Sequence, residues 1–206
     1  MGETADRFTR WYKDKIDLYR QKYYSHEPLD KNARLLQHNG WLNVPFHPAI
    51  RLFLRIIERP GSILDLGCGN GLLLKTLRAQ CRYDLVPFGA DFLEESIAEA
   101  RDEILPAFRN NFVQSNIDTC DLFQRRFTYI FTCPVYSHPD RTENFLMRCV
   151  HHLEPAGRLI LYEYTDANIL EPYHSIRDRS GTTLKGEMIS DSFIRVLYFT
   201  SNDNND

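Results

Sequence analysis

The amino-acid sequence predicts one α/β domain with a doubly wound, mostly parallel sheet flanked by helices. Three observations predict this fold. Segments with strand character alternate with helical segments from about residue 46 to residue 164, and such alternation calls for parallel strands joined by right-handed crossovers. A glycine-rich turn follows the first of these strands. The chain has 206 residues, 43% of them hydrophobic, which is enough for one well-buried core.

Two helices are expected before the first strand. Aromatic side chains recur at three- and four-residue steps between residues 6 and 24, which predicts a helix with an aromatic face. The simplest role for these rings is core packing. A second helix is predicted from Pro48 to Glu58, because its apolar residues share one face and Pro60-Gly61 follows it.

The next elements alternate along the chain. Strands are expected over residues 63–66, 85–91, 111–114, 127–132 and 158–164. Helices are expected over residues 72–77 and 93–105, and before His152. Pro87 lies inside the second strand, and because proline cannot donate a ladder hydrogen bond, we expect that strand to begin late.

The C-terminal part departs from this alternation. Residues 182–189 and 193–199 have strand character and only a short polar link between them, which predicts an antiparallel hairpin. The last residues are polar and rich in turn formers, so a disordered tail is expected. We divide the chain into an N-terminal helical segment over 1–45, a main domain over 46–200 and a tail over 201–206.

Composition excludes several classes of function. The chain has 25 basic and 28 acidic residues and a net charge of −3, without a basic stripe, so nucleic acid is disfavoured as a partner. Its five cysteines are widely spaced and form no C-x-x-C pair, which favours reduced cytoplasmic thiols and predicts no metal site. No apolar run approaches the roughly 20 residues of a membrane span, and no signal segment is evident.

The most informative segment runs from Ile63 to Leu74, where an apolar strand enters a glycine turn and then an apolar helix. Asp65 lies near the carboxyl end of the strand, where open α/β sheets place their ligand. The turn reads G-x-G-x-G from Gly67 to Gly71, unlike the G-x-G-x-x-G of dinucleotide folds. An acid beside it would repel phosphate and suits a ligand with hydroxyl and ammonium groups.

This segment resembles motif I of the class I S-adenosylmethionine-dependent methyltransferases, and further matches follow in the family's order from about Phe46 to Tyr164. The resemblance implies S-adenosylmethionine as cofactor and S-adenosylhomocysteine as product. It implies methyl transfer to an oxygen or nitrogen of a small molecule by in-line displacement. In this family an N-terminal helix often covers the cofactor, so residues 1–45 are expected to form a lid.

The resemblance also assigns cofactor-binding residues. Asp91, at the end of the second strand, takes the ribose hydroxyls, a role compatible with capping the helix that follows. Phe92 packs on the adenine. Asn116 and Ile117 meet the adenine edge, with Asp118 as a competing assignment to Asn116. The other expected contacts are Asp65, Gly67, Cys68, Gly69, Asn70, Thr132 and Cys133.

Catalytic residues are expected in the loop after the fourth strand. His138 is the candidate base for a hydroxyl acceptor, because a neutral histidine has an ordinary pKa of about 6.5; the alternative is a histidine that supports the loop. Tyr136 is expected to line the acceptor pocket, with Tyr23, Tyr24 and Trp41 as weaker candidates together with His26. Cys133 stands where amino-group methyltransferases carry Asn or Asp, so adenine or glutamine methylation is not predicted.

Two functions from different classes remain. One is a small-molecule methyltransferase without nucleic-acid or membrane partners, for which a homodimer is left open. The other is a degenerate, non-catalytic partner subunit. Many family members follow the fifth strand with a helix and a final strand pair, whereas only the hairpin is readable here. We therefore expect a five-stranded sheet with one exposed edge, which lowers stability and favours association.

Overall fold

The computed structural model describes residues 48–133, 137–164, 182–190 and 194–201, together with residues 10, 13, 14 and 17. The account below concerns these residues. The predicted N-terminal segment lies almost wholly outside them, as do Tyr23, Tyr24, His26, Trp41 and Tyr136.

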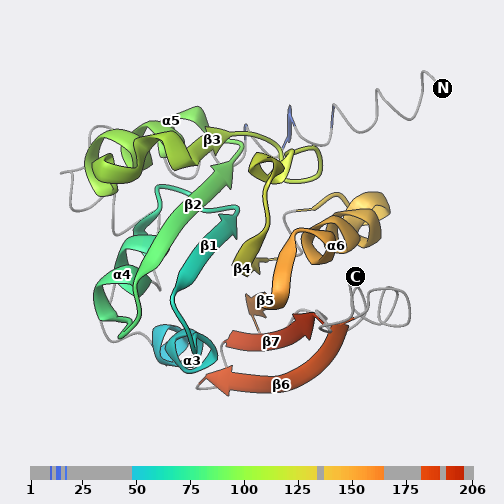
Figure 1. Cartoon of the computed structure of the whole chain (residues 1–206). Coiled ribbons are helices and arrows are strands. Elements are labelled where there is room, and N and C mark those ends of the chain that lie inside the picture. Colours follow the sequence, from blue (N-terminus) through green and yellow to red (C-terminus); the bar gives the residue numbers. More distant parts are fainter. Residues whose placement is uncertain are drawn as a thin grey trace.

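The centre of the molecule is a seven-stranded sheet in the order β3-β2-β1-β4-β5-β7-β6 (Figure 1). The strands are β1 Gly61–Leu66, β2 Leu85–Asp91, β3 Phe112–Gln114, β4 Phe127–Thr132, β5 Leu153–Tyr164, β6 Thr182–Ser190 and β7 Ile194–Ser201. Strands β1 to β5 pair in parallel, and β7 is antiparallel to both of its neighbours. The predicted doubly wound, mostly parallel sheet and its antiparallel hairpin are confirmed.

The hairpin corrects one expectation. We expected the sheet to end at the fifth strand with an exposed edge, but β7 covers that edge from the pair Arg158–Thr200 to the pair Tyr164–Ile194. Strand β6 then pairs with β7 on the outside. The hairpin therefore extends the central sheet, and the sequence did not show this because the pairing joins distant segments. Ser201, the first residue of the predicted tail, belongs to β7 and its hydroxyl donates to the Glu154 carbonyl over 2.9 Å.

Strand β2 corrects a second expectation. It begins at Leu85, opposite Gly61 of β1, although Pro87 predicted a later start. Strand β3 pairs with β2 only from Gly89 onward. Pro87 thus lies where β2 has not yet met β3, and a missing N–H costs no ladder hydrogen bond on that side.

The helices cover the two faces of the sheet. They are α3 Pro48–Ile56, α4 Leu72–Gln80, α5 Glu94–Glu99 and α6 Thr142–His151. One core cluster contains apolar residues of α3, α4 and α5, and the other contains those of α6 (Figure 1). Side chains that alternate along each strand enter these two clusters in turn, as Ile63 and Leu64 do on β1. None of the helices in the described segments is long and apolar enough to cross a membrane.

The helix expected over residues 93–105 is divided. Helix α5 ends at Glu99, and a π-helical turn continues over Ala100–Ile104. The Leu105 N–H donates to the Ala100 carbonyl over 2.9 Å, which is the wider π-type spacing. Pro106 then begins a 3-10 turn, since its ring cannot continue the helix.

Candidate active site

The carboxyl ends of β1, β2 and β4 form one edge of the sheet, where the strand order changes direction. Leu66 of β1 stands beside Ala90 of β2 on one side and Thr132 of β4 on the other. Ligands of open α/β sheets bind at such a switch point. Asp65 and Asp91, the two acids predicted from the sequence, lie at the ends of neighbouring strands on this edge.

The glycine turn after β1 has a backbone that favours glycine. Gly67, Gly69 and Gly71 have φ angles of 89°, 52° and 77°, in the left-handed region that strains other residues. The N–H groups of Gly67 and Cys68 donate to the Ala90 carbonyl over 2.8 and 3.1 Å. A Cβ at Gly69 would meet no atom within 4 Å among the described residues beyond its chain neighbours. The turn is therefore tied to β2 and open at Gly69.

Asp91 braces this turn and the start of α5. Its Oδ2 accepts a hydrogen bond from the Gly69 N–H and its Oδ1 accepts one from the Leu93 N–H, both at 2.9 Å. The side chain is buried. Burial raises the pKa of Asp91, and the hydrogen bonds from the backbone offset part of this effect. Each carboxylate oxygen has a second lone pair, so Asp91 can still accept ligand hydroxyls. The expected N-cap role of Asp91 is wrong, because the N-cap residue of α5 is Leu93 and Asp91 bonds the N–H of that residue from the end of β2.

Asp65 is almost fully buried, with 1% of its surface exposed. Burial and then the negative charge of Asp91 raise the pKa of Asp65 to about 7, and a hydrogen bond from Tyr162 opposes the rise. The Tyr162 hydroxyl lies 3.5 Å from Asp65 Oδ1. Sequence reasoning missed Tyr162, because β4 separates β5 from β1 in the sheet. A tyrosine at the end of a buried strand, whose hydroxyl needs a partner, was the only signal.

The other two residues predicted in the turn point inward. Cys68 is buried and its thiol donates to the Gly69 carbonyl over 3.4 Å. Burial, Asp91 and Asp65 raise the pKa of this thiol well above its usual value. Asn70 is fully buried, its Nδ2 donates to Glu99 Oε2 over 3.2 Å, and its Oδ1 accepts from the Leu72 N–H. Asn70 thus ties the turn to α5 and supports the backbone that a ligand would meet.

The segment after β3 organises the loop after β4. Asn116 Oδ1 accepts a hydrogen bond from the Asp118 N–H over 2.9 Å, which closes a local turn. Asp118 is buried and accepts from the Ser137 hydroxyl and from the His138 N–H at 2.9 Å. Ile117 lies in the core. Asp118, the competing candidate for adenine, therefore joins the two predicted ligand loops, while Asn116 remains at the surface of the turn and is half-buried.

Thr132 and Cys133 lie at the end of β4. Thr132 is fully buried and its hydroxyl donates to the Leu66 carbonyl over 3.2 Å, so it holds β4 against β1. Cys133 is buried beside it. Phe92 is half-buried, and its carbonyl accepts a hydrogen bond from Gln114 Nε2 over 3.3 Å. This contact places the residue after Asp91 next to the end of β3.

His138 is buried on the loop that Asp118 holds. Its Nδ1 accepts a hydrogen bond from the Asp140 N–H over 3.2 Å. A neutral histidine that accepts at Nδ1 carries its proton on Nε2. The His138 carbonyl accepts from the Arg141 N–H at 2.8 Å and from the Thr142 hydroxyl at 3.2 Å. Within the described residues, no three His, Cys, Asp or Glu side chains are grouped so that they could hold a metal ion.

Comparison with known proteins agrees with this geometry. Residues 64–159 match the model of a methyltransferase domain family. This segment of the chain is therefore similar to a methyltransferase domain. The match begins inside β1 and ends inside β5, so it includes the glycine turn, both acids and the loop after β4.

Two curated methyltransferases are similar in sequence. The chain is 28% identical over 102 residues to a ubiquinone biosynthesis O-methyltransferase of Rickettsia conorii, covering 48% of this chain and 34% of that protein. It is 27% identical over 172 residues to the ribosomal RNA large subunit methyltransferase G of Vibrio atlanticus, covering 77% of this chain and 40% of that protein. The chain thus matches well under half the length of either relative.

Solved structures of methyltransferases share the fold of this chain. A TehB-like SAM-dependent methyltransferase from Corynebacterium glutamicum has a TM-score of 0.65 at 20% identity, covering 83% of this chain and 96% of that one. The magnesium protoporphyrin IX methyltransferase of Synechocystis with bound SAM has a TM-score of 0.57 at 15% identity, covering 91% of both chains.

The residues at this edge of the sheet fit S-adenosylmethionine. The turn is open at Gly69, where a ligand can approach the backbone. Asp91 keeps lone pairs for ribose hydroxyls. Asp65 and Asp91 place two buried acids side by side, and a ligand with cationic groups offsets their mutual repulsion. The donor set therefore suits a cationic nucleoside better than a nucleotide.

Proposed function

We propose that this protein is an S-adenosylmethionine-dependent methyltransferase that transfers a methyl group to an oxygen or nitrogen of a small molecule by in-line displacement. The observation that carries the proposal is the braced glycine turn, in which Asp91 bonds both Gly69 and Leu93 while Asp65 stands on the neighbouring strand. The bound cofactor supplies a methyl group on a positively charged sulfur. The protein then has to align an acceptor with that methyl group.

Each predicted residue has a role in this proposal. Asp91 binds the ribose hydroxyls and Phe92 packs on the adenine. Asn116 and Ile117 present an amide oxygen and a backbone N–H to the adenine edge. A second group consists of Asp65, Gly67, Cys68, Gly69, Asn70, Thr132 and Cys133, which form or support the part of the site that holds the amino-acid end.

His138 and Tyr136 are our candidates for the acceptor side. If His138 accepts a proton at Nε2, its remaining proton must lie on Nδ1, which breaks the hydrogen bond from the Asp140 N–H. A base role for His138 therefore requires the loop to give up the hydrogen bond from the Asp140 N–H to His138 Nδ1. An amine acceptor that is already neutral needs no such base, and His138 then acts by holding the loop shape.

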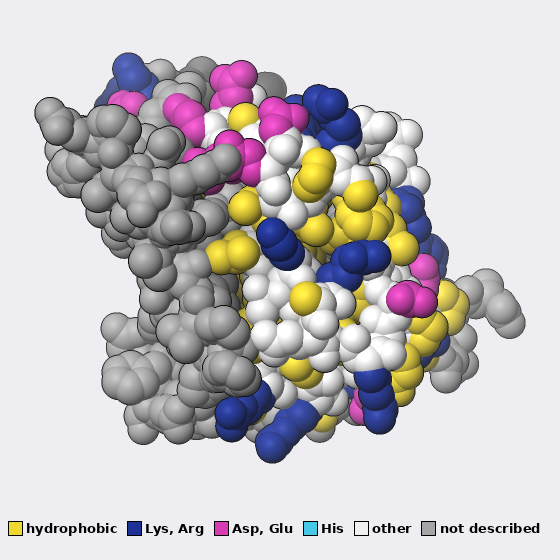
Figure 2. Space-filling view, turned by 90° about the vertical axis from the view of Figure 1, so that its left-hand side faces the viewer, with side chains coloured by type: hydrophobic (Ala, Val, Ile, Leu, Met, Phe, Trp, Pro, Cys, Tyr) yellow, Lys and Arg dark blue, Asp and Glu magenta, His cyan; other side chains and the backbone are white. Residues whose placement is uncertain are grey.

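A small-molecule acceptor is favoured by charge. The chain has 28 acidic and 25 basic residues, whereas binding to phosphate backbones relies on clustered Lys and Arg. On the face seen in Figure 2, acidic side chains gather in one area and the Lys and Arg side chains are spread over several places. The Rickettsia relative is named for ubiquinone biosynthesis, which agrees with this class of acceptor.

Ribosomal RNA is the second candidate acceptor. It is favoured by the Vibrio relative, which matches 77% of this chain and is named for ribosomal RNA. The chain aligns with less than half of that protein, so the part of the relative that binds RNA can be a segment that the alignment does not include.

The degenerate, non-catalytic alternative is less favoured, because the sheet extends beyond β5 and the turn is braced. We also propose that the protein is cytoplasmic, which its five free cysteines favour, and that it forms a homodimer.

Methyl transfer with a labelled donor separates these possibilities. The protein is incubated with methyl-labelled S-adenosylmethionine and either a small-molecule metabolite extract or purified ribosomal RNA. Label in the small-molecule fraction supports the proposal, and label in RNA alone overturns the acceptor class. Binding of the donor without label in any fraction supports the non-catalytic alternative. A sedimentation experiment on the same sample measures the oligomeric state.

A further inference from the structure

Tyr162 and Asp65 form a contact that the proposed function leaves unexplained. Tyr162 lies near the end of β5 and Asp65 near the end of β1, with β4 between the two strands. The Tyr162 hydroxyl reaches Asp65 Oδ1 over 3.5 Å. Both residues are buried, with 6% and 1% of their surface exposed. Removing two polar groups from water costs free energy. A long-range contact between two such groups at the ligand edge therefore indicates a role in the site.

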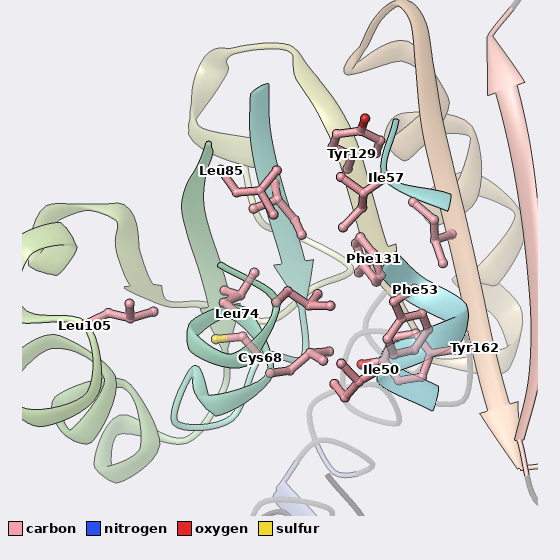
Figure 3. Close-up of a cluster of buried hydrophobic side chains, with 14 of the residues drawn as sticks. Ile50, Phe53, Ile57, Cys68, Leu74, Leu85, Leu105, Tyr129, Phe131 and Tyr162 are labelled. Carbon is pink, nitrogen blue, oxygen red and sulfur yellow. The ribbon is translucent and has the colours of Figure 1, made fainter. Parts of the chain in front are cut away.

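Apolar neighbours fix the position of the Tyr162 ring. It packs edge-on against Phe53 of α3 at 5.5 Å between ring centroids, and Phe53 packs against Phe131 of β4 at 5.2 Å. Figure 3 shows Tyr162 beside Phe53 and Ile50 at one end of this cluster. A ring held in this way has little freedom to turn, so the hydroxyl stays directed at the carboxyl group.

The ionisable groups around Asp65 differ in their effect on its pKa, because Asp91 raises it and Tyr162 lowers it. Among the described residues these groups are Asp91 from β2, Cys68 from the turn and Tyr162 from β5. Helices α3 and α4 and strand β4 bring mainly apolar side chains to this face of the sheet. Burial and the charge of Asp91 raise the pKa of Asp65 to about 7, and the Tyr162 hydroxyl stabilises the ionised form. Asp65 is therefore close to half protonated at neutral pH.

We propose that Tyr162 is a positioning residue of the cofactor site that acts through Asp65, and that Asp65, in the molecules where it is protonated, releases its proton to solvent as the cationic methyl donor binds. This inference rests on the proposed function, because it takes S-adenosylmethionine as the ligand. The ligand brings two positive charges, one on its sulfonium and one on its ammonium group, to a site with two acids. None of the described ionisable groups named above is basic. A cation beside a carboxyl group favours its ionised form. Tyr162 lowers the cost of that ionisation.

The sign of the effect follows from linkage. The pKa of Asp65 is about 7 in the free protein and lower in the complex, so affinity rises as the pH rises toward 7 and levels off above it. The proton released per bound ligand falls from about 0.9 at pH 6 to about 0.5 at pH 7 and about 0.1 at pH 8. Without the Tyr162 hydroxyl the pKa of Asp65 is higher in the free protein, so binding weakens most at low pH.

Calorimetric titration of the full chain with S-adenosylmethionine tests the proposal. Titrations at pH 6, 7 and 8 in two buffers of different ionisation heat give the number of protons released. The Asp65→Asn variant, titrated in the same buffers, accounts for the ligand's own amino group. We expect the difference between wild type and Asp65→Asn to follow the pH series given above.

Two tyrosine variants separate positioning from general stability. Tyr162→Phe should bind about fivefold more weakly than wild type at pH 6 and nearly as well at pH 8, for a hydrogen bond of ordinary net strength. Tyr129→Phe is the matched control, because Tyr129 is also buried but lies at the opposite end of the cluster (Figure 3). Its hydroxyl bonds the backbone of Glu58 and Arg59 at 3.0 Å. Its affinity should follow the wild-type pH profile.

The outcomes are distinct. Equal proton release by wild type and Asp65→Asn overturns the proposal, and this comparison needs no tyrosine variant to fold. An equal loss of affinity at every pH in Tyr162→Phe shows a merely structural tyrosine and also overturns it. Failure of the wild type to bind S-adenosylmethionine at any pH refutes the proposed function itself, and the inference falls with it.

Discussion

Replacing Asp91 by alanine tests the half of the site on which the cofactor assignment depends. The change removes the acceptor of two backbone hydrogen bonds, one from Gly69 in the turn and one from Leu93 at the start of α5, each at 2.9 Å. It also removes the acid expected to hold the ribose. The same side chain therefore contributes to stability and to binding, and the two losses can be measured apart.

The expected magnitudes differ. Loss of the two hydrogen bonds from backbone N–H groups costs about 0.5–1.5 kcal/mol each, and relief of a buried carboxyl whose pKa is raised offsets part of it, so unfolding in urea should change only modestly. Two charge-assisted hydrogen bonds to the ribose contribute roughly 1.5–3 kcal/mol each. Their loss should weaken S-adenosylmethionine binding by about two orders of magnitude or more at 25 °C.

Calorimetry on wild type and Asp91→Ala measures the affinity, and urea unfolding of the same samples measures stability. Thr128→Ser, a buried change near the start of β4 and so at the end of the strand away from the ligand edge, is a control for mild destabilisation. Unchanged affinity in Asp91→Ala would refute the ribose assignment. A loss of binding that follows the loss of stability in both variants would refute a specific role for the carboxylate.

Three further predictions concern neighbouring residues. Gly89→Ala should lower the free energy of unfolding by about 1–3 kcal/mol in urea titrations, because its Cβ would lie 2.6 Å from Cys68 Sγ and 2.7 Å from the Phe112 ring. The pKa of Asp65 is about 7 in the folded protein and 3.8 ordinarily. The contribution of Asp65 to stability is therefore full below about pH 4 and is lost as the pH rises toward 7. Asp65→Asn should flatten this part of the pH profile of stability measured by thermal unfolding. His138→Ala should lower kcat for methyl transfer while calorimetry finds S-adenosylmethionine affinity little changed.

Each of these predictions has a contradicting result. A Gly89→Ala protein as stable as wild type would show that the turn can move away from β2. Identical pH profiles for wild type and Asp65→Asn would show that Asp65 is ionised in the free protein. An unchanged kcat for His138→Ala would remove this residue from the acceptor side of the site.

The sequence predicted the glycine turn and the placement of the two acids at one edge of the sheet because their signals are local. The apolar strand, the glycine turn and Asp65 follow one another in the chain, and the left-handed φ angles of Gly67, Gly69 and Gly71 are the reason for those glycines. Asp91 was accessible to sequence reasoning for the same reason, since it ends a recognisable strand. The family model that matches residues 64–159 covers this same region.

The features that the sequence did not show depend on contacts between distant segments. Tyr162 reaches Asp65 across β4, and no spacing rule predicts a contact between separate strands. The carboxylate of Asp118 bonds the loop after β4, whereas the sequence offered it only as a rival to Asn116. The covered edge of β5 likewise depends on the return path of the chain to the sheet.

Calorimetric titration of the wild-type chain with S-adenosylhomocysteine tests the central claim most directly. This ligand keeps the ribose, the adenine and the amino-acid end, and it cannot be consumed by methyl transfer. We predict saturable binding at one site per chain, which Asp91→Ala abolishes or weakens about a hundredfold or more. No detectable binding at millimolar ligand would contradict the claim that the braced turn after β1 is a cofactor site.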